Sequence, residues 1–238
     1  MLDAVLFDLG DTLMRWSWDD ALVDAGHGAG LAAIGREPLP ELTARFREAY
    51  LPLLEAPGVL EEVEYPGLVR QVLGDVGIAI SDDELNRFLD AEHGAWAPAR
   101  FVAGTTHALL EALRDRGLRL GLVSNAIDPP WLMHRDLERE GIAERLDAAV
   151  FSSEVGWRKP HRAIFDRALE LLGGVDPKRT LFVGDSLAND VAGAGALGMT
   201  TVQALWFHAD AYPGAPQPDY QAFTQMDVLN IAARVSAT

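Results

Sequence analysis

An apolar run at residues 4–7 gives way to a polar turn that contains Asp8, Gly10 and Asp11. A carboxylate at such a point lies where an open α/β sheet presents its chemistry, at the carboxyl end of a strand. Asp and Gly are also ordinary turn formers, and Asp8 could simply bond its own backbone two residues on. The run alone is therefore a weak indication of a catalytic carboxylate.

Three later segments repeat the pattern of an apolar run that ends in a polar group able to contact phosphate. The groups that follow these runs are Ser124 with Asn125, then Lys159, and finally Asp185 with Asp190. Each run is short, and each is followed by a helical segment, which is typical of parallel strands in an α/β fold. Because such strands end side by side at one edge of the sheet, the polar groups are predicted to converge on Asp8.

The interval between the first and second predicted strands is too long for a simple crossover and predicts an inserted helical domain. Its expected helices span residues 19–34, 40–54, 62–76 and 82–95. Ser81 and Glu84 have the spacing of a capping box at the start of the last one. Beyond the insertion, the sequence predicts helices at 106–116, 161–172 and 187–197 and a further strand at 200–205.

Composition narrows the classes of partner and compartment. The chain has 238 residues and a formal charge of −16, with 36 acidic against 20 basic residues. An acidic surface argues against nucleic acid or an anionic membrane as a partner. Without cysteine, thiolate chemistry and disulfides are excluded. No apolar stretch reaches the roughly 18 residues needed to span a bilayer, and no basic leader is present, so we expect a cytoplasmic protein.

Taken together, these segments resemble the haloacid dehalogenase-like (HAD) hydrolase superfamily. Asp8, Ser124, Lys159 and Asp185 with Asp190 match its four motifs in order and approximate spacing, over residues 4 to about 205. The resemblance implies an α/β fold, with a Rossmann-like parallel-sheet core of residues 1–15 and 99–238. It also implies an α-helical cap, residues 16–98, that closes over the catalytic loop.

The resemblance further implies a Mg²⁺-dependent phosphatase acting on a small phosphorylated metabolite. Asp8 would attack phosphorus and form an aspartyl phosphate. Asp8, the Gly10 carbonyl and Asp185 would bind Mg²⁺. Asp190 is expected to hold the loop or a metal-bound water, although a plain helix-start charge is an equal alternative.

Two further motif positions are expected to bind the substrate's phosphate. Ser124 and Asn125 would donate to its oxygens, and Lys159 would neutralise both Asp8 and the phosphate. Lys159 and Lys178 are the only lysines among the 20 basic residues, so an ammonium at position 159 looks selected for a point charge.

One position departs from the family pattern. Most phosphatases of the family carry a second Asp two residues after the nucleophile as general acid and base, and here that residue is Gly10. Asp11 lies one residue further on and is the remaining candidate for the proton transfer. Since the loss of such a group commonly costs on the order of 10²–10⁴ in rate, a catalytically weak or inactive binding protein is the main alternative.

Other superfamily chemistries fit less well. Haloacid dehalogenases usually lack the acidic motif that Asp185 represents. Phosphonatases need a cap lysine, and residues 14–100 contain none.

The two crossings between core and cap, near residues 14–18 and 96–103, are expected to act as hinge and pocket wall. Trp16, Trp18 and Trp96 lie there, either as ordinary packing or as an apolar wall for the leaving group. The six histidines show no metal-ligand spacing; His93 and His161 are the two that could meet substrate.

Overall fold

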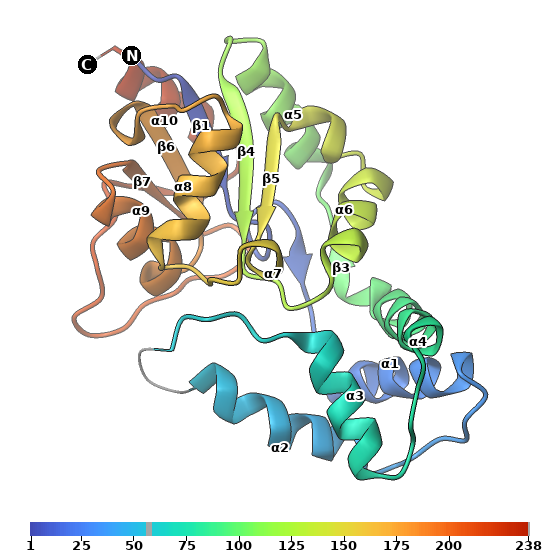
Figure 1. The fold of residues 1–238 in the computed structure, drawn as a ribbon. Coiled ribbons are helices and arrows are strands. Elements are labelled where there is room, and N and C mark those ends of the chain that lie inside the picture. Colours follow the sequence, from blue (N-terminus) through green and yellow to red (C-terminus); the bar gives the residue numbers. More distant parts are fainter. Residues whose placement is uncertain (56–58, 238) are drawn as a thin grey trace.

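The computed structural model describes residues 1–55 and 59–237. Within these residues, six strands form one sheet in the order β5-β4-β1-β6-β7-β8, and all neighbours are parallel (Figure 1). The strands are β1 (Ala4–Phe7), β4 (Arg119–Ser124), β5 (Ala148–Phe151), β6 (Thr180–Gly184), β7 (Thr200–Ala204) and β8 (Tyr220–Ala222). The predicted α/β fold class is confirmed, and Asp8 directly follows an interior strand.

Helices cover both faces of the sheet. One apolar cluster includes residues of α5, α6 and α10, and a second includes residues of α8 and α9. These helices span Gly104–Arg114 (α5), Pro130–Arg139 (α6), Arg162–Leu171 (α8), Ala192–Ala196 (α9) and Asp227–Ser236 (α10). β1 supplies both clusters, since Val5 and Phe7 belong to the first and Ala4 and Leu6 to the second. A strand buried on both faces has a continuous apolar run, as residues 4–7 do.

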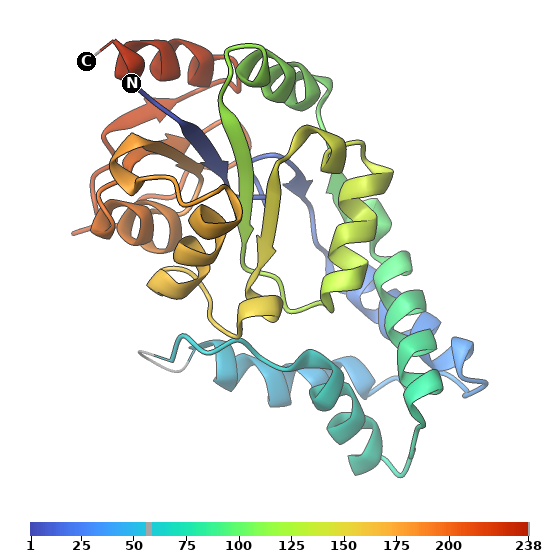
Figure 2. The same ribbon diagram turned by 45° about the horizontal axis from the view of Figure 1, so that its top comes forward.

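The four helices between β1 and β4 build an apolar cluster of their own. They are α1 (Asp20–Ala33), α2 (Leu42–Glu55), α3 (Tyr65–Asp75) and α4 (Asp82–Ala95). Their cluster includes Leu31, Phe46, Leu73 and Phe88. In Figures 1 and 2 this helical layer lies beyond the carboxyl ends of β4 and β5, on the side where the motif residues gather.

The chain crosses between the sheet and this layer on two short strands. β2 (Arg15–Trp16) and β3 (Arg100–Phe101) pair antiparallel, with Arg15 opposite Phe101 and Trp16 opposite Arg100. The two crossings predicted near residues 14–18 and 96–103 are therefore bonded to each other, which fixes the entry and exit of the insertion as one ribbon.

A buried charged cluster also joins α4 to the core. His93 Nδ1 lies 3.1 Å from Asp128 Oδ1, and His93 Nε2 lies 2.8 Å from Asp136 Oδ2 on α6. Arg100 donates to Asp136 and to the His93 carbonyl. Leu132 of α6 belongs to the apolar cluster of the helical layer. One end of the inserted layer is thus anchored on the sheet domain.

Local signals in the sequence account for most element boundaries. The Ser81 hydroxyl accepts from Glu84 N, and the Glu84 carboxylate accepts from Ser81 N, so the predicted capping box is present. The helix expected from residue 62 begins at Tyr65, because Glu64 caps it by accepting from Gly67 N. No helix among the described residues has the length and hydropathy needed to cross a membrane.

Several elements depart from those expected from the sequence. The sequence does not predict β8, α10, the short strands β2 and β3, or the short helix α7 (Ser152–Val155). The helix expected at 187–197 is divided into a π-helical turn at Leu187–Val191 and a short α9. Ser186 caps the π-helical turn by accepting from Asn189 N. This widened turn lets the Asp190 carboxylate bend back and accept from Ser186 N.

Candidate active site

Asp8 lies at the carboxyl end of β1, where the backbone is held by the neighbouring strand. Its backbone N donates to Val183 O, and the residue is only 7% exposed. Lys159 Nζ donates to Asp8 Oδ1 at 2.5 Å. The predicted meeting of the first and third motifs therefore occurs through a buried ion pair across 151 residues of sequence.

Lys159 is positioned by the second motif. Asn125 Oδ1 accepts from Lys159 N at 2.7 Å, and Asn125 Nδ2 donates to Lys159 O at 3.3 Å. Asn125 therefore holds the Lys159 backbone from both sides rather than contacting Asp8. The Lys159 side chain is buried and also donates to Asp190 Oδ1 at 2.7 Å.

The fourth motif brings two carboxylates to the same place. Asp8, Asp185 and Asp190 offer oxygen atoms that all lie within 4.8 Å of one another. Asp190 is buried and packs against Gly184, where an added Cβ would meet its carboxylate oxygen at 2.3 Å. Among the described residues, the Asp185 carboxylate has no hydrogen-bond or ion-pair partner, unlike those of Asp8 and Asp190.

The electrostatics of this cluster call for another cation. Burial raises the pKa of Asp8 to about 6 despite the adjacent Lys159. Burial, together with the carboxylates of Asp8 and Asp190, raises the pKa of Asp185 to about 8. Burial alone would lower the pKa of Lys159, but Asp190 and Asp8 raise it above its ordinary value. The cluster contains three carboxylates and only one ammonium. Carboxylate oxygens are ligands that Mg²⁺ prefers, so this donor set fits Mg²⁺.

These groups line a cavity of about 410 Å³. The predicted residues in its wall are Asp8, Gly10, Ser124, Asn125, Lys159, Asp185 and Asp190. The sequence did not single out His208 and Asp210, which also line it. Both come from the loop after β7, and Asp210 fixes that loop by accepting from Leu187 N at 2.9 Å. Neither lies near a motif in sequence, so spacing offered no signal for them.

The turn after Asp8 places Asp11 away from this cavity. Among the described residues, Asp11 is the one other than glycine with a left-handed backbone, at φ 52°, and its carboxylate accepts from Trp16 N at 3.1 Å. It is absent from the cavity wall, whereas Gly10 and Trp16 are part of it. Gly10 itself does not adopt a positive φ, so the left-handed residue of this turn is Asp11.

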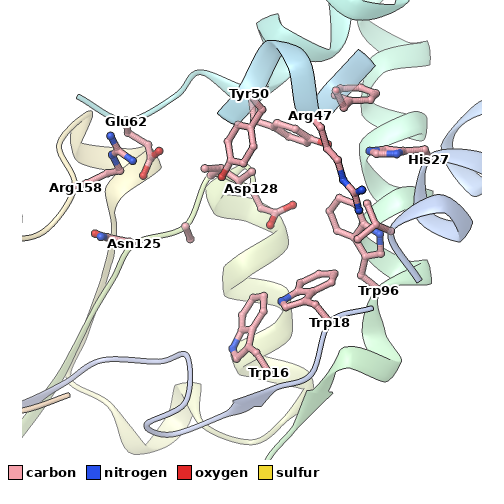
Figure 3. Close-up of a pocket in the computed structure, with 15 residues that line it drawn as sticks. Trp16, Trp18, His27, Arg47, Tyr50, Glu62, Trp96, Asn125, Asp128 and Arg158 are labelled. Atoms are coloured by element: carbon pink, nitrogen blue, oxygen red, sulfur yellow. The ribbon is translucent and has the colours of Figure 1, made fainter. Parts of the chain in front are cut away.

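A second cavity of about 470 Å³ adjoins the first and shares Trp16 and Asn125 with it (Figure 3). It lies between the helical layer and the sheet edge, and Trp18 and Trp96 are in its wall. The two histidines expected to be able to meet substrate lie elsewhere. His93 is buried in the charged cluster, and His161 stacks on Trp157 at 4.0 Å between ring centroids.

The fold and this carboxylate–lysine cluster define an α/β protein that gathers acidic groups at the carboxyl edge of its sheet. A family model for haloacid dehalogenase-like hydrolases matches residues 2–198, and the chain belongs to that family. It is 30% identical to phosphoserine phosphatase of Thermus thermophilus over 235 residues, 90% of this chain and 91% of that protein.

Two other known proteins are similar over most of the chain. Glyceraldehyde 3-phosphate phosphatase of Methanothermobacter thermautotrophicus is 29% identical over 220 residues, 85% of each chain. The crystal structure of a HAD phosphatase from Thermococcus onnurineus superposes with a TM-score of 0.67 at 25% identity and covers 97% of each chain. The relatives named here are therefore phosphatases that match both segments of the sheet and the inserted helices.

Proposed function

We propose that this protein hydrolyses small-molecule phosphate monoesters, with Asp8 as the nucleophile. The observation that carries the proposal is the buried Lys159 ammonium between Asp8 and Asp190, with Asp185 unpaired beside them. An anionic nucleophile can approach an anionic phosphate only where positive charge offsets both. The phosphatase relatives support the same reaction class.

The residues divide the reaction between them. An Asp8 oxygen attacks phosphorus, the bond to the leaving oxygen breaks, and an aspartyl phosphate results. Lys159 offsets the charge of Asp8 and of the phosphate, and Ser124 donates to a phosphate oxygen. Water then attacks phosphorus, which releases inorganic phosphate and restores the Asp8 carboxylate.

Asp8, Asp185 and the Gly10 carbonyl would hold Mg²⁺, which when bound supplies positive charge to the phosphate oxygens. Asp190 has another task in this scheme. It accepts from both Lys159 Nζ and Ser186 N, so it fixes the lysine and the loop that carries Asp185. A carboxylate that only stabilised the start of a helix would not account for these two hydrogen bonds.

We further propose that residues 16–98 act as a cap that limits access of water to the site. The insertion lies over the carboxyl ends of the strands and contributes the far wall of the second cavity. Closure would turn about the β2–β3 ribbon. The bonds of His93 to Asp128 and Asp136 hold α4 against α6, so only a motion that preserves or replaces them is available.

A panel of phosphate monoesters, assayed with Mg²⁺ and with a chelator, tests the proposal. We expect release of inorganic phosphate that depends on Mg²⁺ and is lost in Asp8→Asn. No release from any ester by folded wild-type protein would favour the alternative of a binding protein with this fold. Release of halide from 2-haloacids without Mg²⁺ would favour a dehalogenase, in which Asp185 has no metal to bind.

A further inference from the structure

Seven of the fifteen residues that line the second cavity carry flat rings. Its wall contains the side chains of Trp16, Trp18, His27, Phe46, Tyr50, Tyr65 and Trp96. Trp18 lies 5.5 Å from Trp16 and stands edge-on to Trp96 at 5.4 Å, measured between ring centroids. Such rings prefer aromatic partners in stacked or edge-to-face arrangements. We call this space the aromatic cavity.

The four charged side chains of the aromatic cavity each have a partner, although Arg158 Nε and Trp96 Nε1 are buried without one. Asp128 lies against His93, and Glu62 accepts from Ser152. Arg47 donates to Asp20 at 2.5 Å, and Arg158 donates to Val59 O at 2.9 Å. Figure 3 shows Glu62 and Arg158 at one end of the space, and Asp128 and Arg47 between the rings. The ring faces themselves suit a flat aromatic group.

Trp16 lines both the aromatic cavity and the cavity that contains Asp8, and it offers a hydrogen-bond donor between them. Its indole Nε1 is buried and has no hydrogen-bond partner among the described residues. The same atom lies 3.5 Å from where a Cβ on residue 10 would be, which is the position of the family's missing general acid. A buried N–H without a partner is unfavourable, so a bound group that accepts from it is favoured.

We propose that the aromatic cavity holds the leaving group of an aryl phosphate, a monoester whose oxygen is bonded directly to an aromatic ring. Trp16 Nε1 donates a hydrogen bond to that ester oxygen. This inference rests on the proposed function and specifies its substrate class.

The pairing of Gly10 with Trp16 explains why an aryl ester suits this site. As the bond from Asp8 to phosphorus forms, the bond from phosphorus to the aryl oxygen breaks, and its electron pair remains on that oxygen. An indole N–H stabilises this charge but does not release a proton. A phenolate tolerates the charge through its ring and takes its proton from solvent later, whereas an alkoxide needs the proton during the step.

Three esters separate the fit of the ring from the nature of the leaving oxygen. Phenyl phosphate has an aromatic ring on the oxygen, benzyl phosphate has the ring one carbon away, and cyclohexyl phosphate has no aromatic ring. We expect kcat/KM for phenyl phosphate to exceed both others by about 10²-fold or more, the scale of a missing general acid. Equal values for phenyl and benzyl phosphate would overturn the proposal, as would a preference for nucleoside monophosphates.

Binding without turnover tests the cavity independently of the reaction. In Asp8→Asn, calorimetry should show phenyl phosphate binding up to about tenfold more tightly than cyclohexyl phosphate, as expected for added aromatic contacts. Equal affinities would overturn the assignment of an aromatic occupant. If wild-type protein hydrolyses no ester while this preference remains, the proposed function has failed and the aromatic site has not.

Trp16→Phe tests the donor because it keeps a ring beside Trp18 and removes the N–H. We expect kcat for phenyl phosphate to fall about tenfold, the loss of one hydrogen bond. Affinity for phenyl phosphate in the Asp8→Asn background should stay within about twofold. Trp131→Phe is the matched control, since Trp131 is 43% exposed on α6 and outside both cavities, and its kcat should be unchanged. An unchanged kcat in Trp16→Phe would remove Trp16 from the reaction.

Discussion

The two adjoining cavities are similar in volume, about 410 and 470 Å³, and opposite in character. In the catalytic cavity, charged groups from strand ends lie against one another, as Lys159 does between Asp8 and Asp190. In the aromatic cavity, rings from the insertion and its crossings face one another. Under the proposed function, the sheet supplies the reacting groups and the insertion selects the leaving group.

The largest expected effect is confined to the cavity that contains Asp8 and leaves the aromatic cavity unchanged. Asp8→Asn removes the nucleophile and should lower turnover by about 10⁴-fold or more. Because burial holds the pKa of Asp8 near 6, its ionised form disfavours folding at neutral pH, so the melting temperature should not fall. Phosphate release and thermal denaturation measure the two outcomes. Asp11→Asn, outside the cavity wall, serves as the control with turnover retained; retained turnover in Asp8→Asn would remove Asp8 as nucleophile.

Asp185→Asn should come next, because it removes a ligand without removing the nucleophile. We expect the Mg²⁺ concentration for half-maximal activity to rise about 10–100-fold, the scale seen when metal-site partners are lost. The pKa of Asp185 near 8 lies above its ordinary value of 3.8, so in chelator this group favours folding less as pH rises from about 4 to about 8.

The stability of the same variant reports the metal independently of activity. In chelator, Asp185→Asn should therefore melt above wild type, by a margin that widens as pH rises towards about 8. Mg²⁺ should narrow that margin by stabilising wild type more than the variant. A Mg²⁺ dependence of activity and of melting temperature identical to wild type would show that Asp185 is not a ligand.

Gly10→Asp changes a residue that lies next to Trp16, where the two cavities adjoin. A Cβ at residue 10 would lie 3.5 Å from the Trp16 ring, an ordinary contact, and the backbone there has no positive φ. An acid at this place should raise turnover of alkyl phosphates by up to about 10²-fold and change aryl phosphates little. Steady-state kinetics on ethyl and phenyl phosphate decide it. Wild-type protein that already turns over both equally would mean that another residue supplies the proton.

The contrast between the cavities also explains what the sequence could predict. Asp8, Lys159 and Asp185 each follow an apolar run, and parallel strands bring such ends together, so their meeting is predictable from order alone. The wall of the aromatic cavity depends on where Phe46, Tyr50 and Trp96 lie once the helices of the insertion have packed against one another. No spacing within one segment of the sequence encodes that packing. Only the crossing tryptophans signalled it, because they lie near both ends of the insertion.

Two positions show how the folded loop decides a residue's contacts. Asp11, rather than Gly10, takes the left-handed backbone of the turn, and its carboxylate accepts from Trp16 N. Asn125 lines the cavity with Asp8 and holds the backbone of Lys159, so its expected contact with phosphate stays a prediction. A side-chain amide can serve any nearby backbone, so its partner is decided by the folded loop.

The smallest expected effect concerns His93, which joins α4 of the insertion to the sheet domain. Burial alone would lower the pKa of His93, but its hydrogen bonds to Asp128 and Asp136 raise it above the ordinary value of 6.5. A raised pKa means that the charged His93 contributes stability fully below about pH 6.5 and loses it as pH rises through the folded pKa. As pH rises above about 6.5, melting temperature should therefore fall more steeply in wild type than in His93→Gln, which has no charge to lose. Equal slopes of melting temperature against pH in the two proteins would show that His93 is neutral in the folded protein. Packing of α4 on α6, rather than charge, would then hold Asp128 in the wall of the aromatic cavity.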